Sequence, residues 1–479
     1  MVVFYQPDGA IPRPLPEDHP FQGSDRRGDD PITVLAVKSV VFGHRRGTRG
    51  SRASAGSLDA ALPRAFAAGH WRVPRRFNFT RDVVEVLAKD PKRQALRFVG
   101  NDGVIEPWTF LQLSQGAARW AAILRMHRVK PGDRVLVLEG ASPGWVEIML
   151  GAVKLGAVSV PCPPTLSTAA LGIRIAALTP KLIVAARRVE DELVRTRHDT
   201  PVVYLDDARR HAHRLPEETR TQKTSSHDPA FIVSTSGRTN GPRGVVHAHS
   251  ATFAARVHAE HWLDAGLGDL VWCTAPTHSA QALWSTLFGP WSRGAEVVLY
   301  DGAMEPVEQL ETLRRLGVTV LCQTPAEFRT LAESDQLSHF RWARPRRLVS
   351  TGDALPRDLV GRFEEEWGLT IHDGYGQAET GVIVGHDVRT GYRHGSIGRP
   401  LPGYEVAVVD RDGNELPRNH VGALALGGHP PSLFVGYWDA PEETDAAFRG
   451  DWYVTGDLAA REEEGFLWLR GRTVGSGLE

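Results

Sequence analysis

Three short stretches of the sequence combine hydroxyls, glycines and charged side chains in patterns that suit a phosphate or nucleotide ligand. The first runs from Ser234 to Gly244, reads STSGRTNGPRG and directly follows an apolar run at Phe231–Val233. Backbone N–H groups, hydroxyls and a cation at the end of a strand can converge on an anion. A flexible surface loop has the same composition, so this stretch alone leaves both interpretations open. The candidate phosphate-binding residues are Thr235, Ser236, Gly237, Thr239 and Arg243.

The second stretch runs from Asp373 to Gly381, reads DGYGQAETG and follows an apolar run at Leu369–His372. An aromatic ring such as Tyr375 can stack on a base, and the hydroxyl of Thr380 can donate to a phosphate. Glu379 can hold Mg²⁺ against phosphate oxygens, because Mg²⁺ is usually bound by one or two carboxylates together with substrate phosphates. The alternative is an ordinary turn with a solvated glutamate.

The third stretch, Asp451–Asp457, reads DWYVTGD and is followed by Gly471 and Arg472. A carboxylate such as Asp457 can accept hydrogen bonds from both hydroxyls of a ribose. An arginine such as Arg472 can add donors to the same sugar or to a phosphate. The alternative interpretation makes Asp457 a plain turn residue.

The elements that position these stretches follow from the pattern of apolar runs. Strands are predicted at Glu296–Tyr300, Val318–Cys322 and Arg347–Ser350, and helices at Pro306–Leu316 and Asp358–Trp367. Strands that alternate with helices predict an α/β protein with parallel sheets covered on both faces. Beyond residue 400 the pattern changes to short alternating strands, which predicts a smaller β-rich subdomain.

Local signals are clearest between residues 95 and 161. The apolar run Ala95–Val99 and the Asn-Asp-Gly turn at 101–103 predict a β-hairpin. Thr109 and Gln112, three residues apart, predict a capping box at the start of a helix. Residues 134–161 alternate between apolar runs and one helical stretch, which predicts a βαβ unit.

Length, charge and cysteine content bound the class of protein. At 479 residues the chain exceeds the roughly 250–300 residues at which single cores stop growing, so we expect several lobes. The net charge of −1 gives no general reason to expect nucleic acid or an acidic membrane as a partner. The three cysteines lie far apart, which indicates neither a disulfide framework nor a zinc site. With no apolar run near the ~20 residues of a membrane span and no signal-peptide pattern, we expect a cytoplasmic protein.

Composition also divides the chain into segments. Residues 1–70 are rich in Pro, Gly and Arg and include the run HRRGTRGSR from His44 to Arg52. We expect a divergent extension there, either solvated or a basic contact site for a partner. Residues 71–400 are expected to form the α/β body, and residues 401–472 the β-rich subdomain.

In this order and at these separations, the three stretches resemble the adenylate-forming superfamily of acyl-CoA synthetases, peptide-synthetase adenylation domains and luciferases. Three further segments are most similar to the medium-chain acyl-CoA synthetase branch: Arg76–Asp82, Ser350–Asp353 and Gly450–Trp452. The resemblance runs from about Trp71 to Thr473. It implies the large N-terminal body of the adenylate-forming fold, with mixed or parallel sheets covered by helices, and an enzyme that handles a carboxylic acid activated as acyl-AMP.

The resemblance implies a role for individual residues of this chain. Tyr375 would stack on adenine, and Glu379 would bind Mg²⁺ if ATP is used. His278 would be a gate between the acyl pocket and the channel for the CoA thiol, although a lone histidine is equally compatible with a core or surface residue. The catalytic candidates are His278, Glu379 and Thr380. The AMP-binding candidates are Gly352, Asp353, Asp373, Gly374, Tyr375, Gly376, Gln377, Thr380, Asp457 and Arg472. The acyl-pocket candidates are His278, Trp284 and Thr324.

The chain departs from the family pattern in two places. Arg238, Asn240 and Arg243 stand where the family's phosphate loop usually has Thr, Gly and Lys. Arg243 keeps the charge but presents a wide planar fork in place of a compact ammonium. The family also continues through a hinge aspartate into a mobile C-terminal domain that carries an adenylation lysine. Here that domain is expected to be largely absent, with residues 473–479 as a truncated hinge.

These departures lead to three hypotheses about function. The main one is an enzyme that transfers an acyl group from a preformed acyl-adenylate to CoA with little or no ATP-dependent adenylation, since loss of a charge-stabilising lysine costs adenylation on the order of 10²–10³. A separate adenylating ligase would then supply the adenylate, as in the split acyl-CoA ligases of some actinomycete diterpenoid antibiotic pathways, which the chain resembles. The first alternative is a complete ligase that converts acid, ATP and CoA to acyl-CoA, AMP and pyrophosphate. The second is a non-catalytic acyl-AMP-binding module.

Overall fold

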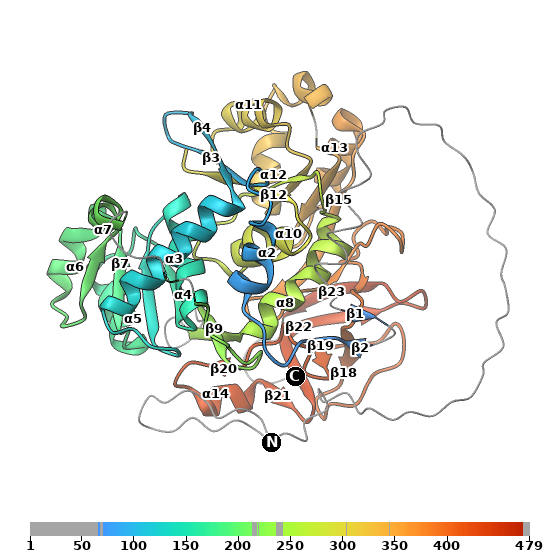
Figure 1. The fold of residues 1–479 in the computed structure, drawn as a ribbon. Coiled ribbons are helices and arrows are strands. Elements are labelled where there is room, and N and C mark those ends of the chain that lie inside the picture. Colours follow the sequence, from blue (N-terminus) through green and yellow to red (C-terminus); the bar gives the residue numbers. More distant parts are fainter. Residues whose placement is uncertain are drawn as a thin grey trace, which may run out of the picture.

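The computed structural model describes most of the 479-residue chain from Phe66 onward. The described residues are 66–67, 70–212, 218, 220–235, 243–302, 304–343 and 345–472. The predicted truncated hinge at 473–479 and residues 1–65 of the predicted extension lie outside this part. Within it, two large mixed sheets, a five-stranded antiparallel sheet and a two-stranded ribbon form the framework. Figure 1 shows three lobes, with the C-terminal strands in red below the other two.

The first large sheet has seven strands among the described residues, in the order β20-β10-β9-β6-β5-β7-β8. They are β5 (Arg134–Leu138), β6 (Val158–Cys162), β7 (Leu182–Ala185), β8 (Val202–Tyr204), β9 (Pro229–Thr235), β10 (Arg243–Ala248) and β20 (Gly436–Tyr437). Strands β9, β6, β5, β7 and β8 are parallel, whereas β10 is antiparallel to both β9 and β20. The predicted βαβ unit is confirmed as β5, α4 (Pro143–Leu155) and β6.

The second large sheet has nine strands in the described part of the chain, in the order β17-β16-β15-β14-β13-β11-β12-β3-β4. They are β3 (Gln94–Val99), β4 (Ile105–Thr109), β11 (Leu270–Cys273), β12 (Glu296–Tyr300), β13 (Val320–Gln323), β14 (Arg347–Ser350), β15 (Ile371–Gln377), β16 (Gly381–Gly385) and β17 (Arg399–Pro400). The central strands are parallel. Both edges are antiparallel, because β3 and β4 form the predicted hairpin and the chain also reverses between β15, β16 and β17. The sheet is therefore mixed.

The third sheet is the predicted β-rich subdomain. It contains β18 (Glu405–Val409), β19 (Val421–Gly427), β21 (Phe448–Arg449), β22 (Trp452–Arg461) and β23 (Leu467–Arg472). The same segment also supplies β20 to the seven-stranded sheet, so the subdomain is joined to the body by strand pairing. The ribbon of β1 (Phe66–Ala67) and β2 (His70–Trp71) packs on it as well, because the indole of Trp71 donates to the carbonyl of Gly403 at 2.8 Å.

Helices cover the two large sheets. Their bounds are η1 (Thr80–Val84), α2 (Glu85–Leu87), α3 (Phe110–Met126), α5 (Thr168–Leu178), η2 (Arg187–Val189), α6 (Glu190–Thr196), α7 (Leu205–Ala212), α8 (His249–His258), η3 (Ala259–Leu263), α9 (Ala280–Ala282), η4 (Leu283–Phe288), α10 (Gly289–Ser292), α11 (Pro306–Leu316), α12 (Pro325–Ala332), η5 (Leu337–Ala343), α13 (Arg357–Trp367) and α14 (Pro441–Ala446). Elements α8 and η3 form one continuous helical segment, and α9, η4 and α10 form another. No helix in the described residues is both long and apolar enough to cross a bilayer.

The local predictions between residues 95 and 161 are confirmed. Strands β3 and β4 form the hairpin. The side chain of Thr109 accepts from the backbone N–H of Gln112, and the side chain of Gln112 accepts from the backbone N–H of Thr109, so α3 begins with a full capping box. Helices α4 and α8 are buried along their whole length. Besides apolar and small side chains, α4 buries Glu147 and Lys154, and α8 buries His249, Arg256 and His258.

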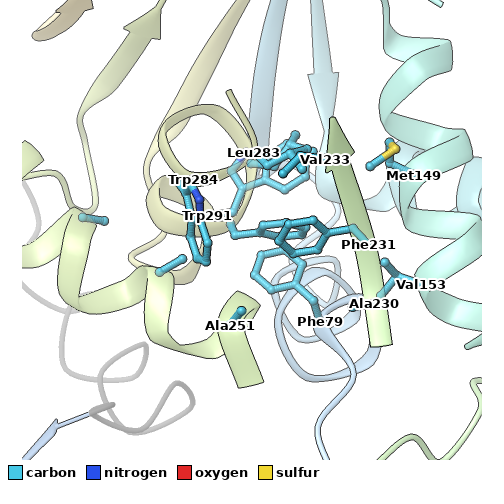
Figure 2. Packing of buried hydrophobic residues seen from close by; sticks show 14 of the residues in the cluster. Phe79, Met149, Val153, Ala230, Phe231, Val233, Ala251, Leu283, Trp284 and Trp291 are labelled. Atoms are coloured by element: carbon cyan, nitrogen blue, oxygen red, sulfur yellow. The ribbon is translucent and has the colours of Figure 1, made fainter. Parts of the chain in front are cut away.

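Aromatic rings fill the core between the two large sheets. Phe231 of β9 is fully buried, stacks on Phe288 with ring centroids 5.4 Å apart and meets Trp284 edge-on at 6.0 Å. Figure 2 shows Phe231 pointing from β9 toward Trp284 and Trp291, with Phe79 nearby. Because these rings come from β9, η4, α10 and the chain before η1, the core ties the N-terminal segment to both sheets.

This packing predicts the cost of removing a core ring. Phe231→Ala should destabilise the protein by about 3–5 kcal/mol, because the cavity is enclosed by rings held on several elements. The measurement is the shift of the first unfolding transition in urea. Val104→Ala at an exposed turn is the matched control and should change stability by less than about 0.5 kcal/mol. Equal effects of the two substitutions would contradict a tightly packed core at Phe231.

Candidate active site

The second stretch is part of a strand. The predicted strand ends at His372, but β15 continues to Gln377, because β14 pairs with it as far as Asp373 and β16 pairs with it from Gly374 to Gln377. Glycine is required at positions 374 and 376, because neighbouring atoms leave no room for a Cβ. A Cβ on Gly376 would lie 1.9 Å from the carbonyl oxygen of Gly381, and one on Gly374 would lie 2.4 Å from the indole nitrogen of Trp262.

Asp457 is the centre of a hydrogen-bond network that joins β15 to β22 and β23. Its Oδ2 accepts from the hydroxyl of Tyr375 at 2.5 Å and from Nε2 of Gln377 at 3.0 Å. Its Oδ1 forms an ion pair with Arg472, which stands opposite it on β23. The hydroxyl of Tyr453 donates to Oε1 of Gln377 at 2.8 Å. Three residues predicted to bind AMP, Tyr375, Gln377 and Arg472, therefore contact the buried carboxylate of a fourth, Asp457.

Glu379 lies beside this network and is partly buried. The hydroxyl of Tyr437 donates to its Oε1 at 2.8 Å. Burial raises the pKa of Glu379, and the hydrogen bond from Tyr437 partly offsets that rise, as do the charges of Arg243 and Arg472. No group of three or more His, Cys, Asp and Glu side chains that could hold a metal occurs among the described residues. A single carboxylate fits Mg²⁺ that arrives with phosphate oxygens and water as its other ligands.

Thr380 is fully buried at the turn between β15 and β16. Its hydroxyl accepts from the backbone N–H of Gln377 at 3.0 Å and donates to the carbonyl of Gly381 at 2.7 Å. In this arrangement the hydroxyl stabilises the turn that presents Glu379. Its contact with a phosphate stays a prediction.

The first stretch connects two antiparallel strands. Thr235 ends β9 and Arg243 begins β10, and the two residues pair directly across the ladder. Arg243 forms an ion pair with Glu443 of α14 at 3.0 Å, and its guanidinium lies over the ring of Tyr437 at 5.1 Å. The candidates Ser236, Gly237 and Thr239, together with Arg238 and Asn240, lie outside the described residues.

The remaining AMP-binding candidates follow β14 and begin β15. Gly352 and Asp353 are exposed, and Gly352 has a φ of +111° that favours glycine. Asp373 is buried and accepts from the backbone N–H of Gly374 at 2.9 Å. Burial raises the pKa of Asp373 to about 8.

The three acyl-pocket candidates come from three different segments of the chain, and their common pocket stays a prediction. His278 lines a cavity of about 270 Å³ at the carboxyl ends of β5, β6, β11 and β12, whose lining includes neither Trp284 nor Thr324. Trp284 is buried in the core beside Phe231 (Figure 2). Thr324 caps α12 and lies near Gly352. Burial and the charge of Arg174 lower the pKa of His278, so its ring is neutral at physiological pH.

Sequence reasoning missed two tyrosines that organise the site. Tyr437 lies in the two-residue edge strand β20, which has no periodic pattern to mark it. Tyr453 lies inside the third stretch, but its partner Gln377 is 76 residues away along the chain. Both become functional candidates only through contacts between distant segments.

Known proteins match this chain over most of its length. Residues 83–438 match the model of the AMP-binding enzyme family. The mitochondrial acyl-coenzyme A synthetase ACSM5 of Mus musculus is 31% identical over 85% of this chain and 74% of its own length. An uncharacterized acyl–CoA ligase of Bacillus subtilis, YtcI, is 31% identical over 83% of this chain and 77% of its own length.

Solved structures have the same fold. An acyl-CoA synthetase of Brucella canis superposes with a TM-score of 0.78 at 26% identity, covering 88% of this chain and 78% of that one. The anthranilate CoA ligase AuaEII, in complex with anthranoyl-AMP, gives 0.77 at 25% identity, covering 85% and 80%. The chain belongs to the AMP-binding enzyme family, and within it to the acyl-CoA synthetases and ligases.

The raised pKa of Asp373 predicts a pH-dependent stability. The pKa of its carboxyl rises from an ordinary value of 3.8 to about 8 on folding, so the folded state holds the extra proton between these values. Its contribution to stability is therefore fully present below about pH 3.8 and is lost as pH rises toward about 8.

Asp373→Asn removes this loss, because an amide does not ionise. The free energy of unfolding of the variant relative to wild type should rise by at least about 1 kcal/mol between about pH 5 and about pH 8. Urea unfolding at the two pH values measures it. Asp353→Asn, at an exposed position of the same site, is the control and should show no such gain. A pH-independent effect of Asp373→Asn would contradict the burial of an ionisable carboxyl.

Proposed function

We propose that this chain forms acyl-CoA from a carboxylic acid, ATP and CoA through an enzyme-bound acyl-adenylate, with release of AMP and pyrophosphate. The observation that carries the proposal is the convergence of Tyr375, Gln377 and Arg472 on Asp457, beside the partly buried carboxylate of Glu379. Such a site offers a ring for a base, a carboxylate for ribose hydroxyls and a ligand for Mg²⁺.

The relatives support the complete reaction over the thioester-forming specialist predicted from the sequence. The mouse and Bacillus subtilis proteins are named as a synthetase and a ligase of acyl-CoA. The anthranilate CoA ligase holds anthranoyl-AMP on the same fold. The proposed substrates are accordingly a small carboxylic acid, ATP and CoA.

The residues divide the work of two displacement steps. In the first, the substrate carboxylate attacks the α-phosphorus of ATP and the bond to pyrophosphate breaks. Asp457 and Tyr375 fix the nucleoside, and Arg243 supplies positive charge toward the departing pyrophosphate. Mg²⁺ bound with ATP would neutralise phosphate charge at Glu379. In the second step, the thiolate of CoA attacks the acyl carbonyl and AMP leaves.

A second candidate function is acyl transfer from a preformed acyl-adenylate to CoA. The orientation of Arg243 favours it, because this cation, placed where the family has a phosphate-binding lysine, is engaged by Glu443 and Tyr437. A separate adenylating ligase would then be the partner. This reaction needs the adenosine and acyl subsites, but it needs no group that binds pyrophosphate.

A paired assay on the purified chain separates these functions. One arm supplies carboxylic acids, ATP and Mg²⁺ and follows pyrophosphate, and the other supplies synthetic acyl-adenylate and CoA and follows thioester. We expect both products. Thioester without pyrophosphate would replace the proposal with the acyl-transfer function, and AMP binding without either product would leave a non-catalytic module.

The nucleoside subsite predicts a specific loss. Asp457→Asn should weaken AMP binding about 10- to 100-fold, because a charge-assisted hydrogen bond is worth about 1.5–3 kcal/mol. Calorimetric titration with AMP measures this change. Asp451→Asn, an exposed carboxylate just before the same strand, is the control and should bind AMP like wild type. Unchanged AMP affinity in Asp457→Asn would place the ribose elsewhere.

A further inference from the structure

Tyr437 stands between the carboxylate of Glu379 and the cation of Arg243. Its hydroxyl donates to Glu379 Oε1 at 2.8 Å, and its ring lies under the guanidinium of Arg243 at 5.1 Å. Its backbone is held on both sides, because it pairs with Val245 of β10 and its N–H donates to Oγ1 of Thr444 at 2.9 Å. The backbone contacts therefore fix Tyr437 between Arg243 and Glu379.

The main chain around Glu379 is also fixed. Its carbonyl accepts from the backbone N–H of Phe434 at 2.7 Å. The carbonyl of the preceding Ala378 accepts from Nε2 of His247, also at 2.7 Å. With the backbone held, the direction of the carboxylate depends on its own side-chain torsions, and the hydroxyl of Tyr437 selects among them.

Arg243 is held in a way that allows exchange of its partner. The guanidinium of Arg243 lies over the ring of Tyr437, and it has further N–H donors for a second partner. Nε of Arg243 forms an ion pair with Oε2 of Glu443 at 3.0 Å, and both side chains are at least a third exposed. Such pairs are weak, so a phosphate can displace Glu443 while the cation–π contact with Tyr437 persists.

We propose that Tyr437 is a positioning residue that holds the Glu379 carboxylate in the orientation that takes the Mg²⁺ of MgATP, and that Glu443 competes with the ATP phosphates for Arg243. This inference rests on the proposed function, because it concerns the same nucleotide site. It assigns roles to a tyrosine and a glutamate that none of the three sequence stretches contains.

The first test is equilibrium binding to the full chain of ATP with Mg²⁺, ATP in EDTA, and AMP. Tyr437→Phe keeps the ring and removes the hydroxyl, so it should weaken binding of MgATP about tenfold and change binding of metal-free AMP less than about twofold. Tyr404→Phe, which removes another buried hydroxyl, is the matched control and should change neither. An equal loss for AMP and MgATP in Tyr437→Phe would reduce Tyr437 to a structural role and overturn the proposal.

The second test moves affinity in the opposite direction. Glu443→Gln removes the competing charge and should tighten binding of ATP about two- to fourfold, both with Mg²⁺ and in EDTA, without changing AMP. Unchanged or weaker ATP binding in this variant would overturn the competition.

Turnover separates this inference from the proposed function. In Tyr437→Phe, pyrophosphate release from acid and MgATP should fall, while thioester formation from synthetic acyl-adenylate and CoA should match wild type. If wild type releases no pyrophosphate, the proposed function fails, and the binding experiments still decide the role of Tyr437. A wild-type chain that binds ATP no more tightly with Mg²⁺ than in EDTA would overturn the positioning role.

Discussion

The buried carboxylate of Asp457 is the interaction on which the rest of the site depends. A buried charge is costly unless it is paired and hydrogen-bonded, and here the donors come from different sheets. Tyr375 and Gln377 belong to β15 of the nine-stranded sheet, whereas Asp457 and Arg472 belong to the β-rich subdomain. The network therefore fixes the subdomain against the body. The same hydrogen bond from Tyr375 to Asp457 also fixes the position of the tyrosine ring.

The seven-stranded sheet enters the site through β20. This short strand comes from the C-terminal part of the chain but pairs with β10, next to the start of that strand at Arg243. It brings Tyr437 between Arg243 and Glu379. Three sheets thus contribute to one cluster, so the site is complete only when all of them are docked. Figure 1 shows β20 below β9, beside the red strands of the subdomain.

The departure from the family's phosphate loop has a structural meaning. An arginine can stack on an aromatic ring and bind a carboxylate in its plane at once, which a lysine cannot do with the same geometry. Arg243 makes both contacts, with Tyr437 and Glu443. The substitution therefore places Arg243 in contact with the tyrosine whose hydroxyl donates to Glu379.

The sequence by itself determined what short-range physics controls. The hairpin of β3 and β4, the capping box of Thr109 and Gln112, and the bounds of β12, β14 and α11 all follow from turn residues and apolar spacing within a few positions. The three stretches also contain Asp457, Tyr375 and Glu379. Only the tertiary structure decided that β15 extends through its motif, because strand length depends on pairing with β14 and β16. It likewise joined Tyr437 to Glu379, since such contacts are set by the packing of segments far apart in the chain.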